Sequence, residues 1–446
     1  MQDLSELTPV IWVGYTFKYR EGGPKLKRVA ETMARELREA HPEADVRLAE
    51  LNSKREFVDE MRAIPEGALI TLHFVGHSGM YGPMFGTTRL PEQFSPHEWR
   101  ELNIPFAPEA RAYFHACRTG RWFSAFFAET FKIPAYGYHW YTTFSTDPVV
   151  FRWEGVSSDE QTPLYMRGCP GKKSHGALAG LKKYLGTVLL EQPQRSDPPT
   201  ERVDAGYDPV AARYASVFEE ITVRRDEWRW VRDRFDALEV SRSEDLSVLD
   251  IGCGNGALLR ELSPRLSRGE GVDVSRQLLE HAREQSASIS HLSFTEIDGP
   301  QLPFPDNTFD VVTSFLSFRY LDWDPLMLEV VRVLKPGGRI LIVDMVTAPL
   351  KLKELPALLR SKLTYERVKR EHPVFYQRLQ ALVSDPAWAQ MLRYNPIRSE
   401  HEMTWYLESR FTGRAVEVIN VGWHNRVLAF DSGPIWDAYI APQSYP

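Results

Sequence analysis

Residues 249–257, Leu-Asp-Ile-Gly-Cys-Gly-Asn-Gly-Ala, determine how the second half of the chain folds. An apolar β-type segment, 248–251, leads through three glycines into a helical pattern. Because glycine lacks a Cβ, a strand–loop–helix turn of this kind lets a ligand approach the backbone closely. With Ala257 in the third position, the spacing also fits the fingerprint of dinucleotide-binding folds. The loop by itself therefore leaves a nicotinamide or flavin cofactor open.

Asp250, just before the loop, distinguishes between ligands of opposite charge. A carboxylate about 5 Å from a pyrophosphate would oppose its binding by about 3 kcal/mol at an effective dielectric constant of about 20. S-adenosylmethionine has no phosphate and carries an ammonium and a sulfonium, so the same carboxylate would attract it. Asp250 thus favours a cationic ligand.

Seven β-type segments are expected in this half, at 248–251, 270–274, 292–297, 311–314, 339–343, 416–421 and 426–430. Helix-length segments separate the first five, which predicts an α/β fold with a parallel sheet. The last two are close enough to form an antiparallel hairpin around His424 and Asn425. Between the fifth and sixth segments, residues 346–415 far exceed an ordinary loop, and we expect a helical insert that covers the acceptor.

Five motifs in order along residues 207–345 resemble those of class I S-adenosylmethionine-dependent methyltransferases of the small-molecule type. They are Tyr207-Asp208 with Ala211 and Tyr214, LDIGCGNG at 249–256, GVDVS at 271–275, LPFPDNTFDVV at 302–312 and LKPGG at 334–338. The resemblance implies a Rossmann-like, seven-stranded fold and S-adenosylmethionine as cofactor.

The same resemblance assigns roles to individual residues. It implies that Gly252, Gly254 and Gly256 border the methionine moiety and that Asp250 helps to hold its amino group. It also implies that Asp273 accepts the ribose hydroxyls, that Asp298 faces the adenine amine and that Tyr207 closes over the cofactor.

The methyl acceptor is less defined. Many relatives carry a His pair where this chain has Ser317-Phe318-Arg319-Tyr320, so no general base is carried over. Direct displacement on a sulfonium depends mainly on holding acceptor and methyl in line. Four further groups are candidates on the acceptor side, each also explained as structural: Tyr320, Asp344, His401 and His424.

Basic residues are concentrated at the start of the insert. Between Lys351 and His372 there are seven Lys and Arg against three Glu, an excess of 7 − 3 = 4 positive charges. This segment is either a solvated helix face or the contact for an acidic or carrier-attached acceptor. Both a small-molecule and a peptide acceptor remain open.

In the first half, a His and a Cys follow successive strands. The apolar segment 68–75 ends in Gly76-His77-Ser78-Gly79, and the segment 111–115 ends in Ala116-Cys117-Arg118. Strands alternate with helices here too, so the two loops are expected at one edge of a parallel sheet. That is the geometry of a cysteine nucleophile and its acid–base partner.

Residues 9–145 resemble the caspase-like, clan CD cysteine peptidases, whose HFxGHG and ACxTG elements stand here as HFVGHSG and FHACRTG. The resemblance implies a parallel-sheet α/β sandwich with Cys117 as nucleophile and His77 as acid–base residue. It places the oxyanion hole at the amides of Cys117 and of Ser78 or Gly79. Ser78 and Thr119 depart from the pattern, so an acyl-transferring or cyclising relative and a non-catalytic recognition module are the alternatives.

Length and composition fit two folded domains. We expect a first domain at 1–190, a proline-rich linker at 191–206 and a second domain at 207–446. The three cysteines lack metal-ligand or disulfide spacing, and the net charge of −6 does not indicate a nucleic-acid partner. No segment has the apolar length of a membrane span, and a cytoplasmic location is expected.

Overall fold

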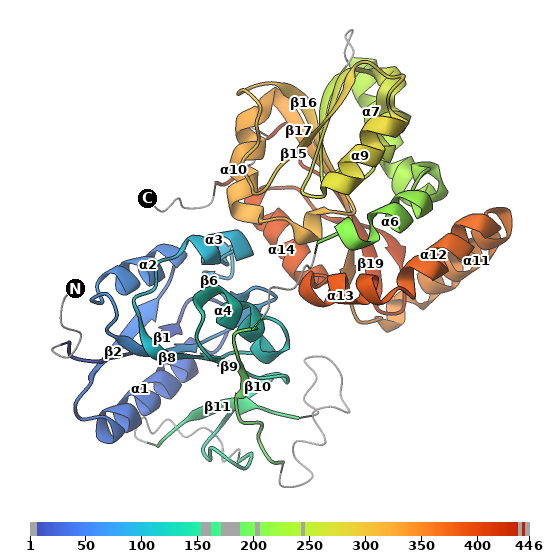
Figure 1. The fold of residues 1–446 in the computed structure, drawn as a ribbon. Coiled ribbons are helices and arrows are strands. Elements are labelled where there is room, and N and C mark those ends of the chain that lie inside the picture. The colour runs from blue at the N-terminus through green and yellow to red at the C-terminus, as the bar shows by residue number, and fades with distance from the viewer. Residues whose placement is uncertain are drawn as a thin grey trace. The chain divides into compact units, whose positions relative to one another are not determined.

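The computed structural model describes residues 7–152, 162–170, 188–200, 206–241, 246–435 and 439–441. It divides into two compact units, a first within Met1–Arg202 and a second within Val203–Pro442 (Figure 1). The boundary falls in the expected linker, of which residues 201–205 lie outside the described ranges.

The first unit is built on a six-stranded sheet in the order β12-β9-β8-β3-β1-β2. Its strands are β1 (Val10–Thr16), β2 (Asp45–Leu51), β3 (Leu69–Val75), β8 (Phe106–His115), β9 (Ala135–Gly137) and β12 (Gln194–Ser196). All neighbours pair in parallel except β12, which runs antiparallel along β9. The linker prediction is therefore wrong at 194–196: between prolines, this short polar segment forms an edge strand, where it needs no apolar burial.

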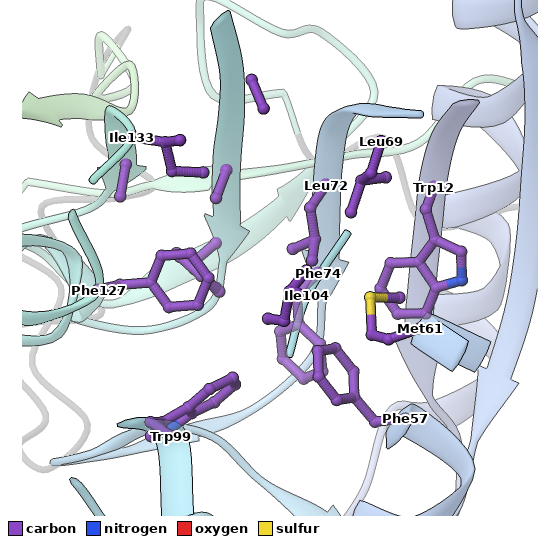
Figure 2. Close-up of a cluster of buried hydrophobic side chains, with 14 of the residues drawn as sticks. Trp12, Phe57, Met61, Leu69, Leu72, Phe74, Trp99, Ile104, Phe127 and Ile133 are labelled. Atoms are coloured by element: carbon purple, nitrogen blue, oxygen red, sulfur yellow. The ribbon is translucent and has the colours of Figure 1, made fainter. Parts of the chain in front are cut away.

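Helices cover both faces of this sheet. On one face lie α2 (Lys54–Arg62), α3 (Pro96–Glu101) and α4 (Phe123–Phe131), and on the other lies α1 (Gly23–Ala40). An aromatic core fills the first face, and Figure 2 shows Trp12, Phe57, Trp99 and Phe127 within it. Trp99 stands edge-on to Phe57 with ring centroids 5.8 Å apart. Three two-stranded pairs lie outside this sheet. They are β4 (Ser78–Gly79) with β5 (Gly82–Pro83), β6 (Phe85–Gly86) with β7 (Pro91–Glu92), and β10 (Thr142–Ser145) with β11 (Tyr165–Gly168).

The second unit contains a seven-stranded sheet in the order β15-β14-β13-β16-β17-β19-β18. The strands are β13 (Leu246–Ile251), β14 (Leu266–Asp273), β15 (Leu292–Glu296), β16 (Phe309–Phe315), β17 (Leu334–Thr347), β18 (Glu417–Val421) and β19 (Asn425–Asp431). The first five are parallel, and β19 runs antiparallel to both β17 and β18. All seven predicted strands and the predicted hairpin are confirmed.

Helices flank this sheet, and an insert extends it. The flanking helices are α6 (Ala211–Val217), α7 (Arg225–Ser241), α8 (Ala257–Leu262), α9 (Arg276–Gln285) and α10 (Trp323–Val333). The predicted insert consists of α11 (Leu355–Glu371), α12 (Pro373–Val383), α13 (Pro386–Tyr394) and α14 (Glu400–Arg410). Of these, α12 packs against both α11 and α6 (Figure 1). Among the described residues, no helix combines the length and hydropathy needed to cross a membrane.

Candidate functional site

The glycine loop links β13 to α8 at the carboxyl end of the parallel strands. Gly252, Gly254 and Gly256 have φ angles of 70°, 54° and 74°, in the left-handed region that side chains disfavour. Asn255 fixes the loop from below, since its Nδ2 donates to the carbonyl oxygens of Ala215 at 3.2 Å and Phe218 at 3.1 Å. The conformation of the loop thus requires glycine at these three positions.

The three glycines differ in what surrounds them. A Cβ on Gly252 would lie 2.4 Å from Cβ of Ser317, and one on Gly256 would lie 2.7 Å from the Phe294 ring. At Gly254 the nearest atom, on the ring of Tyr214, is 3.6 Å away. Gly252 and Gly256 therefore allow close packing of the protein, whereas at Gly254 there is room for a Cβ beside the Tyr214 ring.

Asp250 is a buried carboxylate beneath the loop. Its Oδ1 accepts a hydrogen bond from Thr313 Oγ1 at 2.7 Å. Burial raises the pKa of Asp250 to about 7, and the nearby charge of Asp273 adds to this effect. Asp250 therefore stands at its titration midpoint near neutral pH until a positive charge stabilises the ionised form.

Asp273 ends β14, the strand next to β13. Its two oxygens accept the backbone N–H groups of Gly254 at 2.8 Å and Ser275 at 2.9 Å. Burial raises the pKa of Asp273 as well, although these hydrogen bonds oppose the shift. Among the described residues, no Lys or Arg forms an ion pair with Asp250 or Asp273. Within the described residues, the loop is thus flanked by a buried carboxylate, Asp250, and a partly buried one, Asp273, neither of which has a counter-cation.

Aromatic side chains lie beside these carboxylates. The ring of Tyr207 has its centroid 5.5 Å from Tyr214, 6.0 Å from Tyr320 and 6.2 Å from Trp388. Tyr207 precedes α6, Tyr320 follows β16 and Trp388 comes from α13 of the insert. Asp298 lies exposed in the loop after β15, at the same edge of the sheet.

Known proteins match the region that carries this site. A family model described as a methyltransferase domain matches residues 249–342. A ubiquinone/menaquinone biosynthesis C-methyltransferase of Idiomarina loihiensis is 33% identical over 171 residues, which cover 33% of this chain and 67% of that protein. The chain belongs to the class I S-adenosylmethionine-dependent methyltransferases. Its cofactor is S-adenosylmethionine, which decides against the nicotinamide and flavin alternatives.

Two further comparisons describe the range of relatives of this methyltransferase. A sterol 4-C-methyltransferase of Caenorhabditis elegans is 32% identical over 114 residues, covering 25% of this chain and 34% of that protein. A solved S-adenosylmethionine-dependent methyltransferase from Aquifex aeolicus is 20% identical, with a TM-score of 0.29 over 44% of this chain and 87% of that chain. The chain thus spans about two thirds of one curated relative and one third of the other.

The four candidate groups on the acceptor side of the methyltransferase unit have different environments in the structure. Asp344 is buried, accepts the N–H groups of Arg319 and Met345, both at 2.6 Å, and forms an ion pair with the Arg319 side chain. His401 and His424 are exposed. Only Tyr320 joins the aromatic group around Tyr207, and its hydroxyl is buried without a hydrogen-bond partner in the described structure.

Three residues near the methyltransferase site were given no role from the sequence: Thr313, Ser317 and Trp388. Thr313 reaches Asp250 because β13 and β16 pair in parallel with these two residues opposite each other. Ser317 Oγ donates to the Ile251 carbonyl oxygen at 2.7 Å and so holds its own Cβ against Gly252. No local pattern marks these residues, because strand pairing and the fold of the insert bring them to the site.

In the first unit, the loops carrying His77 and Cys117 are joined. β3 and β8 are adjacent parallel strands, with Val75 opposite His115. Gly76 N–H donates to the His115 carbonyl oxygen at 3.1 Å, and Ser78 Oγ donates to the Cys117 carbonyl oxygen. The structure thus places the two loops at one edge of the sheet, as expected.

The partners of His77 define its tautomer. Its Nε2 lies 3.2 Å from the carbonyl oxygen of Glu21. Because a carbonyl oxygen only accepts, Nε2 carries the proton, and Nδ1 of the neutral ring keeps its lone pair. Burial lowers the pKa of His77, and the charge of Arg20 contributes in the same direction. His77 is therefore arranged as a neutral base.

The Cys117 thiol lies in a partly buried position. Its Sγ is 3.2 Å from Thr142 Oγ1 and accepts the Thr142 N–H at 3.4 Å. Arg118, the next residue, has a φ of 60°, a left-handed backbone conformation that is uncommon for residues other than Gly or Asn. Thr142, on β10, is a partner that the sequence did not reveal.

Proposed function

We propose that the second unit transfers the methyl group of S-adenosylmethionine to a small-molecule acceptor and holds the cofactor at the glycine loop. The two carboxylates beside the loop, Asp250 and Asp273, carry this proposal, because neither has a counter-cation in the part of the chain that the structure describes. An ammonium and a sulfonium would supply the missing positive charge, whereas a pyrophosphate would be repelled. There is room beside Gly254 at the same place. The residues present therefore fit S-adenosylmethionine.

In this mechanism the bound cofactor supplies an electrophilic methyl group on a positively charged sulfur. Asp250 holds the amino group, Asp273 accepts the ribose hydroxyls and Asp298 faces the adenine amine. Tyr207 covers the cofactor and excludes water. Asp344 is held by Arg319 and takes no proton from the acceptor. The chain's main contribution is to hold the acceptor in line with the methyl group.

The aromatic residues favour an acceptor with an apolar, ring-containing body. Tyr207, Tyr320 and Trp388 present ring faces and edges from three separate segments, and such surfaces pack best against other flat apolar groups. The names of the relatives, which include ubiquinone, menaquinone and sterol methyltransferases, agree with this class. We propose a carbon atom of such a molecule as the methyl acceptor: the new C–C bond forms as the methyl–sulfur bond breaks, S-adenosylhomocysteine leaves, and the proton that this carbon loses passes to water.

The affinity for S-adenosylhomocysteine should depend on pH through Asp250. With a pKa of about 7 in the free protein, Asp250 must lose its proton to pair with the ligand's ammonium. Binding is thus full above this pKa and weakens below it, by roughly 25-fold between about pH 7.5 and pH 5.5. Isothermal titration calorimetry at the two pH values measures the change.

The matched variant is Asp250→Asn. It keeps the shape and a hydrogen-bonding group for Thr313 but cannot titrate. We expect weaker binding at pH 7.5 and a much smaller loss on acidification. A variant with the full pH dependence of the wild type would remove Asp250 from the cofactor site.

For the first unit we propose a Cys–His hydrolase of the caspase-like kind. The hydrogen bond from His77 Nε2 to Glu21 carries this proposal, because it leaves Nδ1 as a proton acceptor. In the proposed reaction, the Cys117 proton passes to His77 as sulfur attacks a carbonyl carbon, and His77 then protonates the leaving group. A non-catalytic module that presents an acceptor to the methyltransferase unit is the alternative.

An electrophilic acyl probe should label Cys117 in the wild-type protein, and Cys117→Ala should abolish that labelling. Mass spectrometry of the intact chain and of its peptides measures both. His77→Ala is expected to slow labelling at least tenfold, since the thiol loses its base. Cys169, which is buried, serves as the internal control and should stay unlabelled. Equal labelling of wild type and His77→Ala would favour the recognition module.

A further inference from the structure

Helix α11 presents a row of leucines to solvent. Leu355, Leu359 and Leu363 recur every fourth residue, so they lie along one face, and Leu352 lies just before the helix in the 3-10 turn Leu352–Glu354. We name these four residues the leucine stripe. Leu352 is 87% exposed, Leu359 63% and Leu363 74%. Large apolar side chains gathered in one line are unusual on a surface that contacts only water.

The opposite face of α11 is fixed to the second unit. Leu358 and Val368 are buried there, and Ser361 Oγ donates to Asn420 Oδ1 on β18 at 2.8 Å. Figure 1 shows α11 beside α12, at the outer end of the insert. The leucine stripe therefore faces outward because the helix is anchored from behind.

A tryptophan lies close to the beginning of the stripe. Trp423, 62% exposed, is at the turn between β18 and β19. Arg426 ties this turn to the start of the insert, since it donates to the carbonyl oxygens of Gly422 at 2.9 Å and Pro349 at 3.0 Å and pairs with Glu354. These contacts connect the turn that carries Trp423 to the segment just before the leucine stripe.

Basic side chains border the stripe on both sides. At 100° per residue, Lys362 and Lys369 lie along one border, and Arg360 and Arg367 lie along the other. Within the described ranges, Arg360, Lys362 and Lys369 have no ion-pair partner. Two of the three glutamates in this region are already neutralised: Glu354 pairs with Arg426, and Glu371 pairs with Arg225 and Arg367.

We propose that this surface docks the protein onto an anionic lipid bilayer. The leucine stripe and Trp423 would enter the boundary between head groups and acyl chains, while the Lys and Arg on both borders would reach the negative head groups. Such long basic side chains flanking a single apolar line suit a flat, negatively charged surface. Tryptophan is enriched at this interface because its ring is apolar and its N–H is polar. The proposal does not depend on the methyltransferase acceptor.

Vesicle flotation of the full chain tests the proposal. Wild-type protein should float with vesicles of phosphatidylcholine and phosphatidylglycerol, stay unbound with phosphatidylcholine alone, and lose binding as salt is raised. Leu359→Asp with Leu363→Asp should weaken binding at least tenfold, and Lys362→Glu with Lys369→Glu should remove the preference for anionic vesicles. Leu189→Asp, at a similarly exposed leucine of the first unit, is the control and should bind like wild type.

Folding and oligomeric state complete the test. The shift in melting temperature with S-adenosylhomocysteine reports whether each variant keeps a folded second unit, so lost vesicle binding in a folded variant supports the proposal. Wild-type protein that ignores anionic vesicles would overturn it, and so would stripe variants that bind them normally. A dimer in solution that the stripe variants convert to monomer would also overturn it, because a second copy would then cover the stripe.

Discussion

Gly252→Ala should destabilise the methyltransferase unit by about 3 kcal/mol, because two costs add at this position. Alanine at a φ of 70° costs about 1–2 kcal/mol. Its Cβ would also lie 2.4 Å from Cβ of Ser317, and such overpacking costs typically about 1–3 kcal/mol. Ser317 cannot move away easily, since its Oγ is bonded to Ile251 and lies 2.8 Å from Ser314 Oγ. Differential scanning calorimetry measures this loss of stability. The transition of the methyltransferase unit is recognised because S-adenosylhomocysteine shifts its melting temperature.

Two further variants distinguish the cost of the positive φ angle from the cost of the contact between the new Cβ and Ser317. Gly252→Ala combined with Ser317→Gly removes the overlapping Cβ and should recover the packing part of the loss. Gly254→Ala has a similar φ of 54° but no close neighbour, so we expect only about 1 kcal/mol of destabilisation together with lost cofactor binding. If Gly254→Ala bound S-adenosylhomocysteine as tightly as wild type, Gly254 would not be the cofactor contact.

Acid should unfold the first unit well before the second, because of two buried histidines. Nδ1 of His73 lies 3.2 Å from Nε2 of His115, whose Nδ1 in turn lies 3.2 Å from the Tyr138 hydroxyl. Burial lowers the pKa of His73 to about 3 and that of His115 well below its usual value. Both rings are thus neutral in the folded unit at pH values where they are charged in the unfolded chain.

The sign of this effect follows from the lowered pKa of a base. Stability is complete above the unfolded pKa of about 6.5 and declines as the pH falls below it. For His73 the loss at about pH 4.5 is about 2.7 kcal/mol, and the lowered pKa of His115 acts in the same direction. The first unit's unfolding transition is the one that S-adenosylhomocysteine does not shift. In calorimetry of the full chain, this transition should move to a much lower temperature as the pH falls from about 6.5 to about 4.5.

His73→Phe is the matched variant for the acid effect. A phenyl ring can keep the stacking on Tyr113, whose centroid is 4.8 Å away, but takes up no proton. We expect the His73 part of the pH-dependent loss, about 2.7 kcal/mol at about pH 4.5, to disappear. His41→Gln, at a largely exposed histidine, should leave it unchanged. A His73→Phe protein as acid-sensitive as wild type would show that other groups cause the loss.

The strands of both units could be predicted because their residues carry a local signal. The apolar segments around Val248 and Val311 are too short and too β-branched for buried helices, and helix-length segments separate them. Residues 194–196 carry no such signal, since Gln194, Arg195 and Ser196 are polar and flanked by prolines. They become a strand only because β9 offers an unpaired edge.

The sites divide in the same way. The glycine spacing and the acids at the ends of β13 and β14 are visible in the sequence, as are His77 and Cys117 behind successive strands. Their chemical partners are not visible. Thr313 meets Asp250 through strand register, and Thr142 meets Cys117 from a strand that begins 25 residues later. Glu21, which defines the tautomer of His77, precedes it by 56 residues.

Two α/β folds, the cofactor loop and the candidate nucleophile are visible in the sequence, because each rests on residues that are neighbours along the chain. Which charged groups are neutralised by an ion pair becomes visible only in the folded structure. Asp344 is paired with Arg319, Asp250 and Asp273 have no ion-pair partner among the described residues, and Leu359 and Leu363 of α11 face outward. The physical reason is that charge compensation and burial depend on distances through space, which packing sets.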